Sequence, residues 1–310
     1  LFAGTGAADV PAILAAPASR EIVEWGAGSG RFAADLLAML DREHVDVSRY
    51  AIVETSATLR ERQRERLGGD ARVAWLAAPP QRVSGAIVMN EVLDAVPPIA
   101  IARAGGKWLE RGVAVDGGRF AWATRPLADG ALLAQAEARF PDRGDYASEI
   151  NPAAEALVEQ CAASLADGAM LVFDYGFAGG AYYHPQRDQG TLMAHYRHRT
   201  TSDVFIWPGL ADVTAHVDFS AVARAAERGG LQVAGFTSQA AYLLGAGILD
   251  RLMDVGEPGS IPFVRESAAV QKLVSPAEMG ELFKVLALAR SADIGWRGFV
   301  MGDKSPTLRR

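Results

Sequence analysis

Three glycines at alternate positions, Gly26, Gly28 and Gly30, follow a short run at residues 22–25 that is typical of a buried strand. Apolar residues then recur at helical spacing between residues 32 and 40, so the glycines form a turn between a strand and an amphipathic helix. Glycine has no Cβ atom, so the backbone N–H groups of such a turn can approach a ligand closely. The pattern predicts a ligand-binding turn, with a tight turn that binds nothing as the alternative.

Two features of this turn indicate which ligand it binds. A dinucleotide fingerprint has its third glycine three residues after the second, where this chain has Arg31. Glu24 lies two residues before the first glycine and would direct a carboxylate at the site, which suits an ammonium or sulfonium group better than a pyrophosphate. We therefore expect S-adenosyl-L-methionine rather than NAD, bound by Glu24, Gly26, Ala27, Gly28 and Gly30.

A second acid ends the next apolar run. Residues 50–53 lead into Glu54, which lies 24 residues after Gly30. Nucleotide-binding α/β domains place a carboxylate near this position to hold both ribose hydroxyls. Glu54 is thus a predicted cofactor ligand, with a solvated glutamate at a strand end as the alternative. Beyond it, Ser56 is expected to cap a helix that has Leu59, Gln63 and Leu67 on one face.

Polar residues also follow the predicted fourth and fifth strands. Residues 85–89 are apolar on both faces, as a central parallel strand should be, and Asn90, Glu91 and Asp94 come next. Ligands lie beyond the carboxyl ends of such strands, so these three side chains are expected beside the glycine turn, with helix capping as the alternative. If residues 90–94 begin a helix, Glu91 and Asp94 share one face. Asp174 ends the predicted fifth strand and is a further acid expected at the substrate site.

Four of the five histidines occur between His184 and His216. We expect no metal there, because cysteines and a His-Glu-x-x-His motif are missing and because His195 and His198 lie in an arginine-rich segment that would repel a divalent ion. A long stretch without clear periodicity, rich in aromatic residues and fixed donors, is typical of a loop that lines a binding site or closes it, with a polar surface loop as the alternative. The residues expected to contact substrate are His184, Arg187, His195 and Tyr196.

The elements that must position these residues alternate between strands and helices. Further strands are predicted at residues 73–76, 231–236 and 283–289, the last with a helix as the alternative, and a hairpin at residues 107–122 turns at Asp116 and Gly117. Helices are predicted at residues 152–166, 243–253 and 264–273, with a short one after Ser275 and another at residues 7–18 broken at Pro11 or Pro17. Seven strands with helices between them predict an α/β fold with a doubly wound sheet.

Composition excludes several classes of protein. The chain has 310 residues, of which 50% are hydrophobic and 22% charged, as expected for a globular protein with one large core. Its net charge of -6 gives no general attraction to nucleic acid, and its apolar stretches are too short to span a membrane. Cys161 is the sole cysteine, so a disulfide framework is excluded and a reducing compartment is expected.

Longer motifs occur along nearly the whole chain, at residues 24–31 (EWGAGSGR), 90–95 (NEVLDA), 174–176 (DYG), 182–187 (YYHPQR), 190–192 (GTL), 195–198 (HYRH), 212–219 (DVTAHVDF) and 279–286 (MGELFKVL). Together they resemble the MidA-like family of S-adenosyl-L-methionine-dependent methyltransferases. The resemblance implies a class I methyltransferase fold, Rossmann-like, with the cofactor at residues 24–30 and Glu54. It also implies one domain over residues 1–310, with substrate-binding insertions at about 100–150 and 177–218, and a further N-terminal family segment that this chain lacks.

That family includes a mitochondrial complex I assembly factor that methylates a protein arginine. The resemblance therefore implies arginine N-methylation of a protein substrate, linked to assembly of a respiratory complex. Asn90 would lie near the methionine part of the cofactor, and Glu91 and Asp94 would hold the guanidinium group. The expected location is the bacterial cytoplasm, or the mitochondrial matrix for a eukaryotic chain. A small-molecule O- or N-methyltransferase and a non-catalytic assembly factor that binds S-adenosyl-L-methionine are the alternatives.

Overall fold

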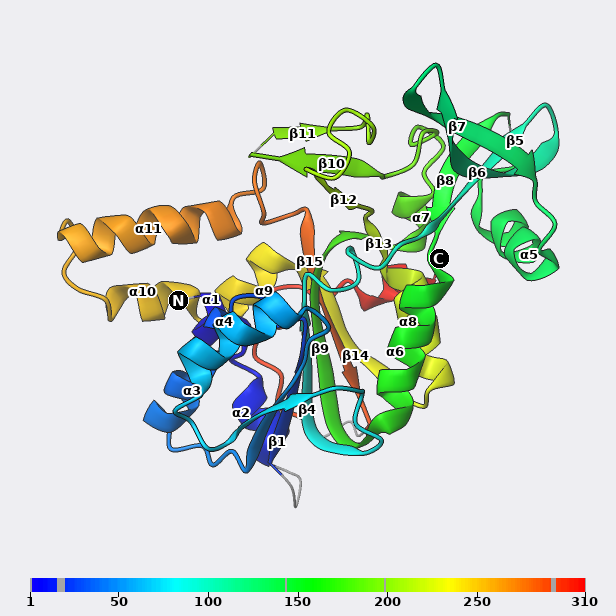
Figure 1. Cartoon of the computed structure of the whole chain (residues 1–310). Coiled ribbons are helices and arrows are strands. Elements are labelled where there is room, and N and C mark those ends of the chain that lie inside the picture. Colours follow the sequence, from blue (N-terminus) through cyan, green and yellow to red (C-terminus); the bar gives the residue numbers. More distant parts are fainter. Residues whose placement is uncertain (1, 16–19, 143, 198, 291–293, 310) are drawn as a thin grey trace. The chain divides into compact units, whose positions relative to one another are not determined.

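The computed structural model describes residues 2–15, 20–142, 144–197, 199–290 and 294–309, and the chain divides into two compact units (Figure 1). Unit 1 consists of Leu1–Val92, Val158–Tyr175 and Ala223–Arg309, and unit 2 consists of Leu93–Leu157 and Gly176–Val222. Two segments of unit 2 thus interrupt the sequence of unit 1. The single domain with two insertions stays a prediction.

Unit 1 is built on a central sheet with the strand order β14-β15-β9-β4-β1-β2-β3. The strands from β9 to β3 run parallel, whereas β15 is antiparallel to both of its neighbours. Central β1 and β4 are largely buried on both faces, because helices cover a doubly wound sheet on two sides. This order confirms the predicted α/β sheet and the strand at residues 283–289. The strands are β1 (Glu21–Trp25), β2 (Arg49–Val53), β3 (Val73–Leu76), β4 (Val83–Asn90), β9 (Leu165–Phe177), β14 (Gln232–Ser238) and β15 (Phe283–Ala289).

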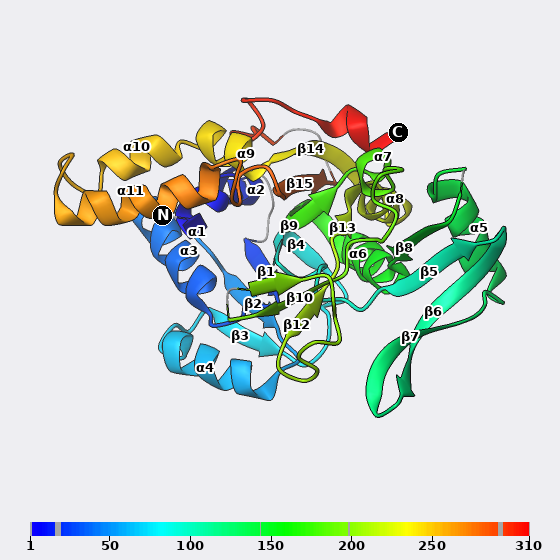
Figure 2. The ribbon, with the colours of Figure 1, turned by 90° about the horizontal axis from the view of Figure 1, so that it is seen from above.

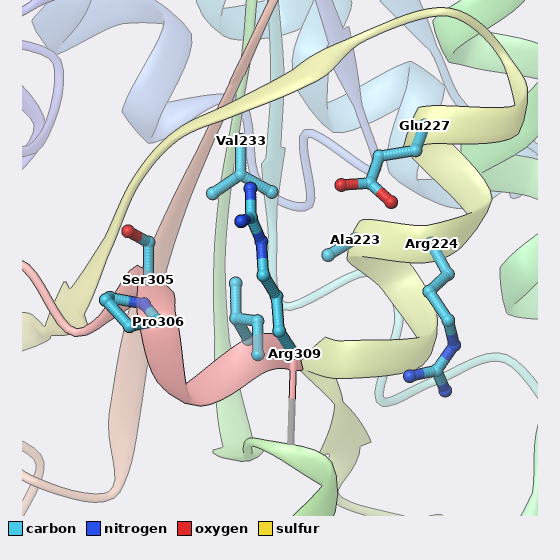
Figure 3. A pocket seen from close by; sticks show the side chains of 8 residues that line it. Ala223, Arg224, Glu227, Val233, Ser305, Pro306 and Arg309 are labelled. Carbon is cyan, nitrogen blue, oxygen red and sulfur yellow. The ribbon is translucent and has the colours of Figure 1, made fainter.

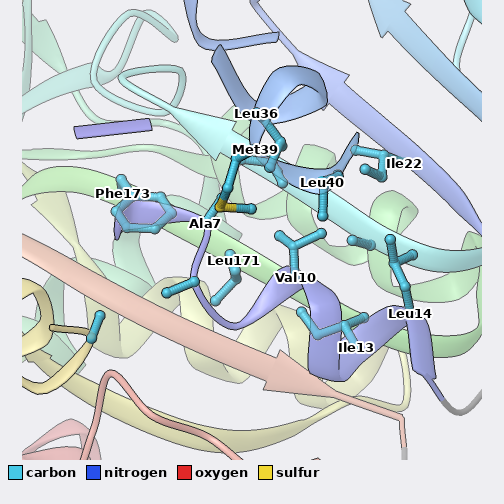
Figure 4. Packing of buried hydrophobic residues seen from close by; sticks show 14 of the residues in the cluster. Ala7, Val10, Ile13, Leu14, Ile22, Leu36, Met39, Leu40, Leu171 and Phe173 are labelled. Atoms are coloured by element: carbon cyan, nitrogen blue, oxygen red, sulfur yellow. The ribbon is translucent and has the colours of Figure 1, made fainter. Parts of the chain in front are cut away.

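Helices α1, α2, α3, α9, α10 and α11 lie on one side of this sheet (Figure 2). On α3, Leu36, Met39 and Leu40 recur at helical spacing and are fully buried. They pack with Val10 and Ile13 of α2 in the main core of unit 1 (Figure 4). The helices of unit 1 are α1 (Phe2–Gly6), α2 (Val10–Ala15), α3 (Arg31–Arg42), α4 (Ala57–Leu67), α9 (Gln239–Gly245), α10 (Ile248–Met253) and α11 (Ile261–Val274), with a 3-10 helix at Ser305–Arg309.

A buried carboxylate joins the N-terminal helices to the C-terminal part of unit 1. Asp9 is fully buried and accepts hydrogen bonds from the Tyr242 hydroxyl at 3.0 Å, the Arg297 N–H at 2.6 Å and the Gly298 N–H at 3.2 Å. A carboxylate can leave water only when donors of this kind replace its hydration. Asp9 therefore fixes the start of α2 against the chain at residues 297–298.

Unit 2 contains an antiparallel sheet with the order β7-β6-β5-β8. The predicted hairpin is confirmed, and Gly117 and Gly118 make its turn with φ of 54° and 78°. A second, smaller sheet has the order β11-β10-β12, and β13 pairs with the end of β9. Helices α6 and α8 run from unit 2 into unit 1. The elements are β5 (Ile99–Ala104), β6 (Lys107–Asp116), β7 (Arg119–Pro126), α5 (Gly130–Arg139), β8 (Tyr146–Ile150), α6 (Pro152–Ser164), α7 (Gly179–Tyr182), β10 (Met193–Tyr196), β11 (Arg199–Thr201), β12 (Asp212–Thr214), β13 (Val217–Asp218) and α8 (Phe219–Arg228).

The histidine-rich stretch between His184 and His216, predicted as a long loop, instead contains the strands of the small sheet. Glu149 of β8 holds part of this segment in place. Its carboxylate is buried and accepts hydrogen bonds from the N–H and hydroxyl of Thr191, both at 2.9 Å, and from the Tyr182 hydroxyl at 3.3 Å. These partners are 42 and 33 residues away, so the local sequence pattern did not show them.

Three helix predictions differ from the structure. Residues 243–253 belong to two helices, α9 and α10, because Gly247 interrupts them with a φ of 83°. The segment after Ser275 forms turns rather than a short helix. Of the helix predicted at residues 7–18, residues 7–9 form a turn and residues 10–15 form α2, with Pro11 in its first turn, where a missing N–H is tolerated. Pro17 lies outside the described residues.

No helix among the described residues combines the length and the apolar composition needed to cross a membrane.

We expect Asp9→Ala to lower the free energy of unfolding by about 2 kcal/mol or more, because the N–H groups of Arg297 and Gly298 lose their acceptor and each unsatisfied donor costs about 1–3 kcal/mol. The Tyr242 hydroxyl can still donate to the Gly6 carbonyl, at 3.1 Å, and Tyr242→Phe should cost about 1 kcal/mol. Urea unfolding followed by circular dichroism measures both values. If both variants lose the same unfolding free energy, the hydrogen bonds that Asp9 accepts from the backbone at residues 297–298 do not stabilise the fold as proposed.

Candidate active site

The three glycines of the turn after β1 face different surroundings. Gly26, Gly28 and Gly30 all have positive φ, of 61°, 52° and 73°. A Cβ atom at Gly26 would lie 3.1 Å from a methyl group of Val92, and one at Gly30 would lie 3.2 Å from a methyl group of Leu67. A Cβ atom at Gly28 would meet no atom within 4 Å. Gly28 therefore leaves open space at the turn, which a ligand can fill.

Glu54 is held close to this turn by a glutamine of α4. The Glu54 carboxylate is buried, with Oε1 accepting from the Ser56 N–H at 2.9 Å and Oε2 accepting from Gln63 Nε2 at 3.1 Å. Gln63 Nε2 also donates to the Gly28 carbonyl at 2.9 Å. The structure thus brings together the glycine turn and the predicted ribose ligand.

The sequence predicts that Gln63 lies on the buried face of its helix, but it does not show which groups Gln63 contacts. A polar residue on an otherwise apolar face was the signal for them.

Glu24, which the sequence predicts to direct a carboxylate at the ligand, is buried beside Tyr50. It is 2% exposed, and the hydroxyl of Tyr50 donates to its Oε2 at 2.7 Å. Burial is the largest effect on the pKa of Glu24 and raises it, the hydrogen bond from Tyr50 lowers it, and the charge of Glu54 raises it. Together these effects place the pKa at about 7. Glu24 is therefore a buried group of unit 1 whose charge changes near neutral pH.

A cleft of about 640 Å³ opens in unit 1 where β4 ends and β15 begins. Asn90 and Glu91 line it together with Arg31 and Phe32 from the start of α3. Because β4 pairs with β1 in parallel, their carboxyl ends lie at the same edge of the sheet as the glycine turn. The sequence prediction missed the contribution of α11, whose lining residues include Arg265, Glu266 and Lys272.

Residues 90–94 do not begin a helix, which was the condition for Glu91 and Asp94 to share one face. Asn90 is the last residue of β4, and Glu91 follows with a left-handed φ of 52° and an N–H that donates to the Phe173 carbonyl at 2.9 Å. This bond extends the ladder between β4 and β9 by one residue. Asp94 is buried and belongs to unit 2, where its carbonyl accepts from the Ala215 N–H at 3.4 Å. Glu91 and Asp94 therefore do not share a helical face.

Asp174 does not end its strand, because β9 continues to Phe177. It is fully buried, and its Oδ1 accepts from the Tyr175 N–H at 2.9 Å.

The other predicted substrate residues lie in unit 2, each with local contacts of its own. His184 Nδ1 accepts from the Gln186 N–H at 3.2 Å, and the Arg187 guanidinium lies 4.2 Å from the centre of the Phe177 ring. His195 and Tyr196 belong to β10, and the Tyr196 ring lies 5.2 Å from that of Trp207. His198 lies outside the described residues. Within the described part of the chain, no group of three His, Cys, Asp or Glu side chains is placed to hold a metal ion.

Another cleft of unit 1, of about 440 Å³, lies between α8, β14 and the 3-10 helix (Figure 3). Arg224, Glu227 and Arg309 line it. None of the residues predicted from the sequence lines this second cleft.

Comparison with known proteins identifies the family of the chain. A family model described as "Putative S-adenosyl-L-methionine-dependent methyltransferase" matches residues 7–237. The mouse protein arginine methyltransferase NDUFAF7, mitochondrial, is 30% identical over 203 residues, which are 64% of this chain and 44% of that protein. The human protein is 33% identical over 166 residues, which are 52% of this chain and 35% of that protein. The match therefore spans less than half the length of these two relatives.

A solved structure covers more of the chain. A protein from Burkholderia thailandensis, described as a candidate methyl transferase bound to S-adenosyl-homocysteine, is 47% identical with a TM-score of 0.93. The match covers 99% of this chain and 80% of that one.

We expect Gly28→Ala to weaken binding of S-adenosyl-homocysteine at least tenfold, because the new methyl group occupies the open space at the turn. Gly117→Ala is a matched control, since Gly117 has a similar φ of 54° and equally open surroundings at the hairpin tip. Titration calorimetry on both variants separates the effect of the added atom from backbone strain. Undiminished binding by Gly28→Ala would place the cofactor elsewhere.

The pKa of Glu24 makes stability depend on pH. Its value of about 7 lies above the ordinary value of 4.5, so between these values the folded chain holds a proton that the unfolded chain releases. The resulting stabilisation is complete below pH 4.5 and is lost as the pH rises through about 7. Relative to Glu24→Gln, the native chain should lose up to about 3 kcal/mol of unfolding free energy by pH of about 8. Urea unfolding of both proteins at a series of pH values tests this prediction. It is wrong if the unfolding free energies of the two proteins depend on pH in the same way.

Proposed function

The chain belongs to this family of S-adenosyl-L-methionine-dependent methyltransferases, and we propose that it methylates an arginine side chain of a protein. The carboxylate of Glu91 in the cleft beside the glycine turn carries the proposal. The names of the mouse and human relatives, both protein arginine methyltransferases, support it. A link to assembly of a respiratory complex is part of the proposal and rests on the resemblance described above.

The residues of the cofactor site fit this chemistry. When bound, S-adenosyl-L-methionine supplies a methyl group attached to a positively charged sulfur. In our proposal Gly28 leaves room for the cofactor backbone, Glu54 accepts hydrogen bonds from the ribose hydroxyls, and Asn90 lies near the methionine part. Because the methyl group is already activated, the chain has to orient the acceptor and balance charge.

Charge balance is the central requirement for an arginine acceptor. A guanidinium group stays protonated in proteins, so it would lie beside the positive sulfur of the cofactor. A carboxylate in a partly dry cleft offsets that repulsion and accepts the parallel N–H groups of the guanidinium. Glu91 offers such a carboxylate, and Glu266 of α11 offers a second one in the same cleft.

The backbone of Glu91 supports a fixed position for its side chain. A left-handed φ is unfavourable for a residue with a Cβ atom, and such residues cluster at functional sites. The hydrogen bond from its N–H to Phe173 ties this conformation to the sheet. We propose that this backbone directs the Glu91 carboxylate at the acceptor. Separately, Asp94, His184, Arg187, His195 and Tyr196 stay proposed contacts of the protein substrate.

Glu91→Gln should reduce methyl transfer about a hundredfold while S-adenosyl-homocysteine affinity stays within about threefold, since the lost charge contacts the acceptor rather than the cofactor. Glu65→Gln, an exposed residue of α4, is the control. Mass spectrometry of candidate protein substrates incubated with labelled S-adenosyl-L-methionine measures the transfer. Full transfer by Glu91→Gln, or a product methylated on lysine, carboxylate or a small-molecule oxygen, would contradict the arginine proposal. Cofactor binding without any transfer would point to a non-catalytic factor.

A further inference from the structure

We propose that Gln63 is a positioning residue of the cofactor site, which orients the Glu54 carboxylate and the Gly28 carbonyl as one rigid group. The inference rests on the proposed ribose contact of Glu54. It concerns a residue that would not touch the cofactor, since Gln63 is fully buried behind the two groups that do.

Both ends of the Gln63 amide have partners. Nε2 donates to the Gly28 carbonyl at 2.9 Å and to Glu54 Oε2 at 3.1 Å. Oε1 accepts from the indole N–H of Trp75, on β3, at 3.1 Å. One side chain thus joins the glycine turn after β1, the acid after β2 and the strand β3.

The chemistry of these partners fixes the orientation of the amide. The indole N–H of Trp75 can only donate, so it must face the amide oxygen. The Gly28 carbonyl and the ionised Glu54 carboxylate can only accept, so they must face the amide NH₂ group. Rotating the amide by half a turn would break all three hydrogen bonds, and therefore Gln63 has one stable orientation.

The bonds to Glu54 leave its carboxylate able to bind a ligand. Each carboxylate oxygen can accept about two hydrogen bonds. Oε1 uses one for the Ser56 N–H and Oε2 uses one for Gln63, so each oxygen keeps one free site. Two remaining sites on one fixed carboxylate match the two hydroxyls of a ribose. Gln63 and Ser56 thus set the rotation of the carboxylate plane without occupying its ligand-binding capacity.

The third glycine of the turn is explained by the same contact. A Cβ atom at Gly30 would lie 3.3 Å from Cγ and 3.4 Å from Cα of Gln63. Glycine at this position therefore allows α4 to pack closely enough for Gln63 to reach Gly28. Of the three glycines, Gly28 faces open space and Gly30 faces the positioning residue.

The test measures S-adenosyl-homocysteine affinity by titration calorimetry for three substitutions. Gln63→Met keeps the length of the side chain but loses all three hydrogen bonds, and we expect affinity at least tenfold lower. Gln63→Glu places a second carboxylate beside Glu54 at a pH of about 8, and should also bind at least tenfold more weakly. Near pH 5.5 this pair can hold one proton, whose O–H again donates to Glu54, so affinity relative to the native chain should recover about fivefold or more. Glu54→Gln measures the ribose contact itself.

Leu288→Ala controls for loss of stability, because Leu288 is a fully buried core residue of β15 that lies outside the site. It should lower the melting temperature without weakening binding. Gln63→Met affinity within threefold of the native chain, a Gln63→Glu pH profile that follows the native one, or equal weakening by Leu288→Ala would overturn the inference. If Glu54→Gln weakens binding and Gln63→Met does not, the inference alone fails. If Glu54→Gln has no effect, the ribose contact is wrong and the inference fails with it.

Discussion

The hydrogen bonds from the amide of Gln63 hold together the parts of unit 1 that the candidate cofactor site needs. The carboxyl ends of β1 and β2 are adjacent because the two strands pair in parallel, but pairing alone does not fix the turn and the acid that follow them. Gln63 connects the Gly28 carbonyl and the Glu54 carboxylate across that edge. The sheet thus provides the approximate position of the site, and one buried amide provides its exact geometry.

Two buried glutamates, Glu24 and Glu149, differ in the number of hydrogen bonds that their carboxylates accept. Burial raises the pKa of both Glu24 and Glu149. Glu149 receives donors from Thr191 and Tyr182, which stabilise its charged form and join distant segments of unit 2. Glu24 receives the Tyr50 hydroxyl, and its pKa of about 7 leaves it able to gain or lose a proton under physiological conditions. Glu149 thus joins distant parts of unit 2 through its hydrogen bonds, and Glu24 is a buried acid with a single such donor from a side chain.

Features set by local periodicity were predicted well from the sequence. The strand at residues 85–89, the hairpin at Gly117 and the strand at residues 283–289 all follow from alternation, apolar runs or turn residues. Features set by partners far away in the sequence were not predicted. Examples are the hydrogen bonds of Glu149 and the continuation of strand β9 beyond Asp174. At Glu91 the hydrogen bond to the Phe173 carbonyl continues the pairing of β4 with β9, a partner that the segment at residues 90–94 alone cannot reveal.

The segmented layout of unit 1 determines when the cofactor-binding half can form during synthesis. Strand β15 lies between β9 and β14, and residues 223–309, which supply β14 and β15, follow the unit 2 segments Leu93–Leu157 and Gly176–Val222. At about 5–20 residues per second, a ribosome needs on the order of ten seconds to make that final segment. During this interval the edge of β9 that later pairs with β15 lacks its partner, while all of the unit 2 sequence is already available. Unit 2 can therefore fold on the nascent chain before unit 1 closes, and a chaperone has a defined period in which the exposed strand edge needs protection.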